Sequence, residues 1–105
     1  MRSLQFIVDG QRIRKDPKCD FSNIVAGSVG YLKAIFCFST EWDGCKKAAS
    51  FWLDDREYSV LLDNDNACII PKETLTDERF YVSVTGAKPG YKIKTSRTKV
   101  IQEVY

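Results

Sequence analysis

The sequence contains no histidine, which removes most of the usual catalytic arrangements. Histidine is the commonest general base near neutral pH and the usual activator of serine and cysteine nucleophiles. The segment Gly27-Ser28-Val29-Gly30 lacks the spacing of a nucleophile elbow, and no Lys-Ser or Lys-Thr follows it to complete a phosphate-binding loop. We therefore expect no enzyme, no catalytic residue, no bound cofactor and no small-molecule substrate.

Metal-binding patterns are also missing from the sequence. None of the four cysteines lies within four residues of another, whereas zinc ligands usually come in closely spaced pairs. Residues 63–66 begin like a calcium loop, but Cys68 and Thr74 occupy the positions that require glycine and glutamate. We expect no metal site, and we expect free thiols that pack as small, buried or half-buried apolar side chains.

Long apolar runs and a strong charge imbalance are absent as well. No segment approaches the roughly 20 apolar residues that span a bilayer, and the N-terminus turns polar at Asp9-Gly10 before a signal-peptide core forms. A net charge of +2 is too small to predict nucleic acid or a membrane as partner. We expect a protein that is made in a cytoplasm and not secreted.

A two-residue alternation of apolar and polar side chains runs through most of the chain, and this period is typical of β-strands. The 105 residues fit one domain, residues 1–105. The pattern predicts an all-β fold, an antiparallel β-sandwich or small barrel of about seven to nine short strands. We expect a long connection over residues 15–30, one short helical turn over 71–75 and a loop over 86–90, with strands over 4–8, 11–14, 31–38, 47–53, 57–62, 67–70, 79–85, 91–95 and 98–104.

The large aromatic side chains divide into two groups by this alternation. Four phenylalanines fall on regular inward positions and are predicted to form the core: Phe36, Phe38, Phe51 and Phe80. Trp52 and Tyr81 fall on the opposite faces of their strands. Large aromatic residues are enriched at protein interfaces, although loops also cover part of the outer face of a sandwich.

A basic stretch follows Gly86, where five positive residues and no acid occur before Val100. The more ordinary explanation is edge protection, because lysines on an outer strand discourage uncontrolled pairing. The alternative is a basic edge that meets an acidic partner, such as a second copy of the chain. Nucleic acid would need interleaved aromatic residues, and Tyr91 alone is present. The interface candidates are therefore Trp52, Tyr81, Lys92, Lys94 and Arg97.

Several motifs occur in a characteristic order: Val25-Ala26-Gly27-Ser28 before Tyr31 to Phe36, then Trp42-Asp43-Gly44, Tyr58 to Leu62, Ile69-Ile70-Pro71 and Phe80 to Gly86. Over most of residues 21–95 this order resembles the immunoglobulin-like N-terminal domain of phage upper baseplate proteins and related minor tail and virion proteins of Gram-positive hosts. The resemblance implies an immunoglobulin-like sandwich with these structural residues: Trp42, Gly44, Phe51, Pro71, Phe80 and Gly86.

The resemblance also implies a function. It suggests a virion structural protein (tail, baseplate, connector or capsid surface) that assembles with other phage structural proteins and with copies of itself. Baseplate relatives continue into stems and receptor-binding modules, whereas this sequence ends at Tyr105, so we expect a stand-alone tail, connector or capsid-surface protein. Two alternatives stay open: a phage-encoded inhibitor of a host defence protein, and a carbohydrate-binding module with Trp52 as its aromatic platform.

Overall fold

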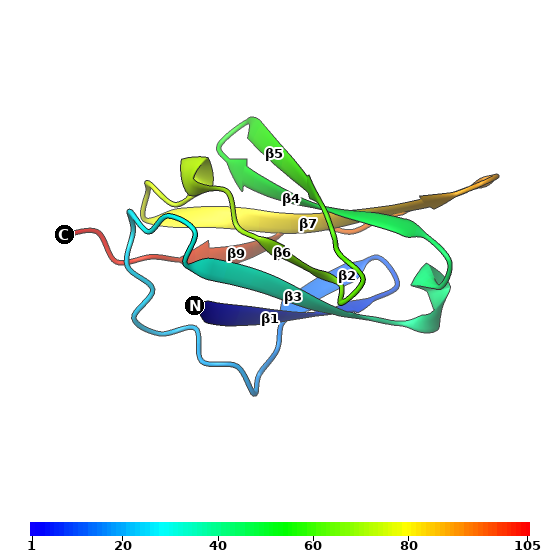
Figure 1. Cartoon of the computed structure of the whole chain (residues 1–105), viewed down its shortest axis with the longest axis horizontal. Coiled ribbons are helices and arrows are strands. Elements are labelled where there is room, and N and C mark those ends of the chain that lie inside the picture. The colour runs from blue at the N-terminus through cyan, green and yellow to red at the C-terminus, as the bar shows by residue number, and fades with distance from the viewer.

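The computed structural model describes residues 1–105 and contains nine strands and two 3₁₀ turns. The strands form two sheets, and Figure 1 shows both termini at one end of the molecule. The four-stranded sheet has the order β2 (Arg12–Lys15), β1 (Arg2–Asp9), β3 (Leu32–Phe38) and β6 (Ala67–Ile69). The five-stranded sheet has the order β5 (Arg56–Leu61), β4 (Lys46–Leu53), β7 (Arg79–Lys88) and β8 (Tyr91–Lys94), with β9 (Thr98–Ile101) also paired to β7. The prediction of an all-β sandwich is confirmed.

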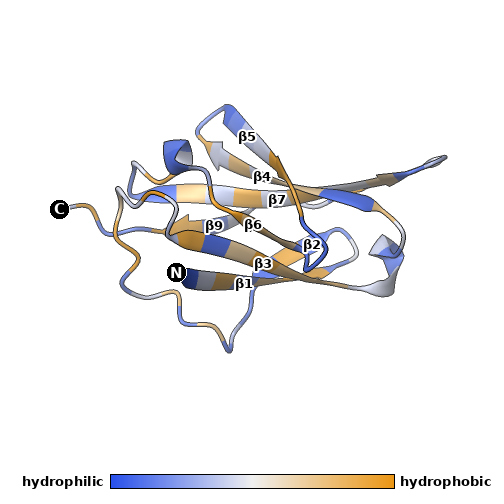
Figure 2. Ribbon diagram, viewed as in Figure 1, coloured by the Kyte–Doolittle hydropathy of each residue, from blue (hydrophilic) through white to orange (hydrophobic).

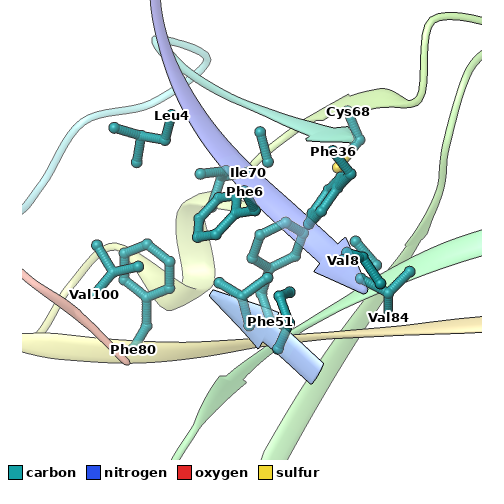
Figure 3. Packing of buried hydrophobic residues seen from close by; sticks show 14 of the residues in the cluster. Leu4, Phe6, Val8, Phe36, Phe51, Cys68, Ile70, Phe80, Val84 and Val100 are labelled. Carbon is teal, nitrogen blue, oxygen red and sulfur yellow. The ribbon is translucent and has the colours of Figure 1, made fainter. Parts of the chain in front are cut away.

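Strand β7 shows how the alternation in the sequence becomes two faces of a sheet. Phe80, Val82 and Val84 point inward and are fully buried, while Tyr81 and Thr85 on the other face are half-buried. Figure 2 shows apolar and polar residues taking turns along this strand. The inward residues join a cluster of 20 buried side chains between the sheets, part of which Figure 3 shows. One continuous core therefore holds the two sheets together.

One strand pair differs from the antiparallel arrangement that we expected. β1 and β3 pair in parallel, with Arg2 opposite Leu32 at the start of both strands. The reason lies in the long connection after β2, which follows the open side of β1 back to its beginning. Along this path Asp16 N–H donates to Gln5 O, and the Arg2 guanidinium donates to three backbone carbonyls of residues 20–23. β3 therefore starts at the same end as β1.

The loop expected over residues 86–90 is wrong in extent. β7 continues to Lys88, and its hairpin to β8 turns at Pro89-Gly90 alone. The pairing of β7 with β4 carries on through this stretch, with Gly86 opposite Lys47. The predicted helical turn is confirmed as η2 (Lys72–Thr74), and a second 3₁₀ turn, η1 (Thr40–Trp42), lies between β3 and β4. Neither turn approaches the length and apolarity of a membrane-spanning helix.

Trp42 fills the end of the sandwich next to the β7–β8 hairpin. Its side chain is fully buried, its Nε1–H donates to Gly10 O at 2.9 Å, and its ring centroid lies 5.0 Å from that of Phe38. A Cβ atom on Gly86 would lie 2.7 Å from Trp42 Cε3 and 3.2 Å from Cys45 Cβ. Gly86 thus lies in β7 because the indole occupies the space that any side chain would need.

Backbone hydrogen bonds outside the two sheets close the sandwich along one side. Ser96 N–H donates to Gln11 O, which joins the β8–β9 connection to the β1–β2 turn. Glu103 N–H donates to Ile24 O, and Ala26 N–H donates to Glu103 O, so the C-terminal segment joins the two sheets further along. On the opposite side, where β5 and β6 are the outermost strands, the connection between these two strands joins the sheets: Leu62 N–H donates to Lys47 O, and Asp63 N–H donates to Ala67 O.

The contact between Gly86 and Trp42 predicts a non-additive stability effect. Gly86→Ala should lower the free energy of unfolding by about 1–3 kcal/mol, because the new methyl group overpacks the site. In a Trp42→Phe background the same change should cost clearly less, since the benzene half of the indole is gone. Denaturant unfolding of the two single variants and the double variant measures this coupling. An equal penalty in both backgrounds would contradict the assigned contact.

Candidate interaction surface

The outer face of the five-stranded sheet brings together four of the five interface candidates. Trp52 on β4 lies opposite Tyr81 on β7, and Lys94 on β8 lies opposite Thr85 on β7. Lys92 lies two residues before Lys94, so it is on the same face. These side chains point away from the core because their strand neighbours point into it. We call this surface the outer face.

Arg97, the fifth candidate, comes from the connection between β8 and β9 and covers Trp52. Its guanidinium carbon lies 3.6 Å from the centroid of the Trp52 ring, close enough for a cation–π contact. Trp52 Nε1–H donates to Ser83 Oγ at 2.9 Å on the neighbouring strand. The indole is therefore half-buried and fixed at both its polar edge and its ring face.

Small hydroxyl side chains occupy the middle of the outer face. Ser50 lies opposite Ser59 on one side and Ser83 on the other, which makes a row across β5, β4 and β7. Ser50 Oγ donates to the Glu57 carboxylate, and Ser83 accepts the hydrogen bond from Trp52. The two inner serines are buried despite facing outward. Two side-chain hydrogen bonds thus link neighbouring strands within the outer face.

Most of the exposed charges on the two edges of this sheet are of opposite sign. The acidic edge lies along β5 and the turns at its two ends; it consists of Asp54, Asp55, Glu57, Asp63 and Asp65 and includes one exposed cation, Arg56. The basic edge lies along β8, β9 and the turns beside them, and it consists of Lys88, Lys92, Lys94, Arg97 and Lys99. The basic stretch was visible in the sequence. Its position opposite the acids depends on the strand order, which the sequence pattern does not provide.

A groove of about 430 Å³ borders the outer face at the end where the termini lie. Tyr81 lines both the groove and the outer face, and Leu53 and Val104 supply apolar lining. The groove also contains the carboxylates of Asp54, Asp77 and Glu78, the last of which lies 3.5 Å from the Arg79 guanidinium. No group of three acidic or cysteine side chains is arranged to hold a metal ion. The groove therefore extends the outer face as a mixed polar and apolar hollow.

The six residues that the family resemblance marks as structural occupy different environments. Trp42, Phe51 and Phe80 are fully buried. Gly44 has φ +76°, a left-handed conformation that favours glycine, and the absence of a side chain at Gly86 makes room for Trp42. Pro71 directly precedes η2, whose Thr74 Oγ1 donates to Pro71 O at 2.8 Å.

The four cysteines are free and differ in environment. Cys45 and Cys68 are buried and Cys19 is half-buried, as expected for small apolar side chains. Cys37 departs from the expectation because it is exposed on β3. It lies opposite Ile7 on the solvent side of the four-stranded sheet, a face that the period-two pattern of β3 left partly apolar.

Removing Arg97 should uncover Trp52. We expect Arg97→Ala to increase acrylamide quenching of tryptophan fluorescence, because the quencher can then reach the ring of Trp52. The change can be assigned to Trp52, since Trp42, the other tryptophan, is fully buried. The lost cation–π contact should lower the free energy of unfolding by about 0.5–1 kcal/mol. Lys99→Ala, which removes an exposed cation from the neighbouring strand, is the control and should leave quenching unchanged. Equal quenching in all three proteins would show that Arg97 does not cover the ring.

The cysteines should react with alkylating reagents in a fixed order. Burial, with a smaller contribution from nearby Asp63, raises the pKa of Cys68 from its ordinary 9.0 to about 12. Since the thiolate is the nucleophile, Cys68 should stay unmodified at pH 8 while exposed Cys37 reacts. The raised pKa favours the protonated thiol in the fold, so its contribution to stability is complete below pH 9 and declines as the pH rises toward 12.

Mass spectrometry after brief iodoacetamide treatment tests this order site by site. The control is the same treatment in denaturant, where all four cysteines should react. Native labelling of Cys68 as fast as Cys37 would contradict its assigned environment.

Comparison with known proteins does not assign the chain to a family. No protein-family model matches the sequence, and no curated protein matches it at a significant level. The resemblance to phage baseplate and virion domains therefore rests on the motifs quoted above, and it stays a prediction.

Proposed function

We propose that the protein is a structural component of a bacteriophage particle and acts through protein–protein assembly, with the outer face as its principal contact surface. The observation that supports this most is the fixed arrangement of Trp52 and Arg97 beside Tyr81. Tryptophan, tyrosine and arginine are the residue types that contribute most to binding energy at interfaces. Side chains already held in place lose little conformational freedom on binding.

The phage assignment draws its support from the motif order in the sequence. Three residues of these motifs lie close together in the structure. Gly86 leaves the space that Trp42 fills, and Trp42 precedes the turn that contains Gly44. Under this proposal the protein is made in the host bacterium and resides in the virion, where its partners are other phage structural proteins and further copies of itself.

The carbohydrate-binding alternative is less well supported because of Arg97. A sugar ring binds to an aromatic platform by stacking on its open face, and the guanidinium at 3.6 Å already occupies a face of Trp52. The alternative of an inhibitor of a host defence protein uses the same contact surface with a different partner. It is separated from the virion role by where the protein is found.

Mass spectrometry of purified phage particles tests the proposal. We expect peptides of this chain at an abundance comparable to that of known structural proteins, and we expect Trp52→Ser/Arg97→Ser to reduce incorporation. The control variant is Lys72→Ser/Glu73→Ser, which changes exposed residues of η2 away from the outer face. Absence from particles, together with co-purification with a host protein from infected cells, would replace the virion role with the inhibitor role.

A further inference from the structure

We propose that copies of this chain associate head to tail, with β5 of one copy adding to β8 of the next, so that the five-stranded sheet continues from copy to copy. The proposed function supplies only the biological setting for this inference. The partner itself, a second copy, is argued from backbone hydrogen bonding, strand direction and charge.

Strand β5 offers unpaired backbone groups along an exposed edge. Leu62 N–H donates to Lys47 O, so this residue pair is hydrogen-bonded toward β4. Because hydrogen-bonded and non-hydrogen-bonded pairs alternate in an antiparallel ladder, Glu57, Ser59 and Leu61 direct their N–H and C=O groups toward the open edge. β5 contains no lysine or proline; its two charged residues, Arg56 and Glu57, lie at its start, and Leu61 near its end is 75% exposed. Such an edge is a template for strand addition.

Strand β8 is the corresponding edge at the other side of the sheet, and its two lysines disfavour pairing with any strand except an acidic one. Thr95 N–H donates to Val84 O, and the same alternation directs the backbone groups of Lys92 and Lys94 away from β7. Lys94 O already accepts a hydrogen bond from the exposed Gln11 side chain, which confirms its direction. Beyond Lys94 this edge is covered, because Ser96 N–H donates to the backbone carbonyl of Gln11 in the β1–β2 turn. The part of the edge that is open to a second copy therefore runs from Tyr91 to Lys94, where only the exposed Gln11 side chain has to be displaced.

The directions of the strands allow the two edges to pair without turning a copy over. β5, β4, β7 and β8 are each antiparallel to their neighbours, so β5 and β8 run in opposite directions. A second copy that is related by translation, or by rotation about an axis along the strands, keeps its direction and its outer face. Its β5 therefore meets β8 of the first copy as an antiparallel neighbour.

The charges on the two edges select a register. Matching the residues with free backbone groups places Lys94 opposite Glu57 of the next copy and Lys92 opposite Ser59. Opposite charges directly across an antiparallel pair are stabilising. In this register the acidic edge of one copy thus faces the basic edge of the next.

Pairing of β5 with itself is disfavoured on the same grounds. A two-fold pairing centred on Ser59 uses the whole strand but sets Asp55 level with Asp63 of the partner, acid against acid. Like charges opposite each other destabilise a strand pair. The head-to-tail contact joins two different surfaces and leaves a free edge at each end, so it produces rings if the rotation closes and filaments if it does not.

Reversing one charge on each edge tests the pairing. At low ionic strength, light scattering should give wild-type protein a mass that rises with concentration above the 12.0 kDa of one chain. Glu57→Lys or Lys94→Glu alone should raise the dissociation constant about tenfold, because attraction becomes repulsion. The double variant, and an equal mixture of the two single variants, should recover association. Lys72→Glu and Glu73→Lys, reversed at exposed sites of η2, are the controls.

A proline substitution separates strand pairing from charge attraction alone. Ser59→Pro removes an N–H that faces the open edge, so it leaves the hydrogen bonds to β4 in place. This variant should stay folded by circular dichroism but lose association, whereas Ser59→Thr, which keeps the N–H, should associate. Wild-type protein that is monomeric at every concentration, or single reversals that change nothing, would overturn the inference. Neither result bears on detection in particles, so the proposed function is tested separately.

Discussion

The packing of the Trp42 indole between the β1–β2 turn and β7 is the interaction on which the arrangement of the two sheets depends most. The indole is fully buried, donates to the carbonyl of Gly10 in the β1–β2 turn and lies against the backbone of β7 at Gly86. One side chain from η1, the turn that connects the two sheets, therefore contacts the β1–β2 turn of one sheet and β7 of the other. Glycine at residue 86 leaves this space to the indole, and β7 stays paired with β4 on both sides of it. Beyond this point the β7–β8 hairpin projects from the sandwich, as Figure 1 shows.

The way the chain closes the sandwich determines which surfaces remain for partners. Hydrogen bonds from Ser96 and Glu103 join the sheets along one side. On the other side β5 stays an outermost strand with exposed residues and acidic turns, while lysines line β8 across the same sheet. Between them, Trp52 and Arg97 give the outer face a rigid centre. Fold and surface are thus linked, since the strand order that buries the core also separates the charges.

Much of the fold could be predicted from the sequence, because side chains with a period of two report directly on a buried face. The inward position of Phe80 is of this kind and is confirmed, and so is the helical turn after Pro71, which was predicted from the tolerance of proline at the start of a helix. The parallel pairing of β1 with β3 could not be predicted, since the path of a long irregular connection depends on contacts such as those of Arg2. The aromatic and basic candidates were found from facing and charge alone. Their stacking, and the acids opposite them, arise from strand order, which alternation does not encode.

Concentration-dependent hydrogen exchange tests the continuing sheet most directly. Backbone amides of Tyr58 and Val60 point toward β4 and serve as internal references, whereas those of Glu57 and Ser59 point toward the open edge. The account predicts that Ser59 and Lys92 exchange quickly in dilute protein and become protected in concentrated protein, while Val60 is protected throughout. Equally fast exchange of Ser59 at both concentrations, in a sample that nevertheless associates, would contradict it.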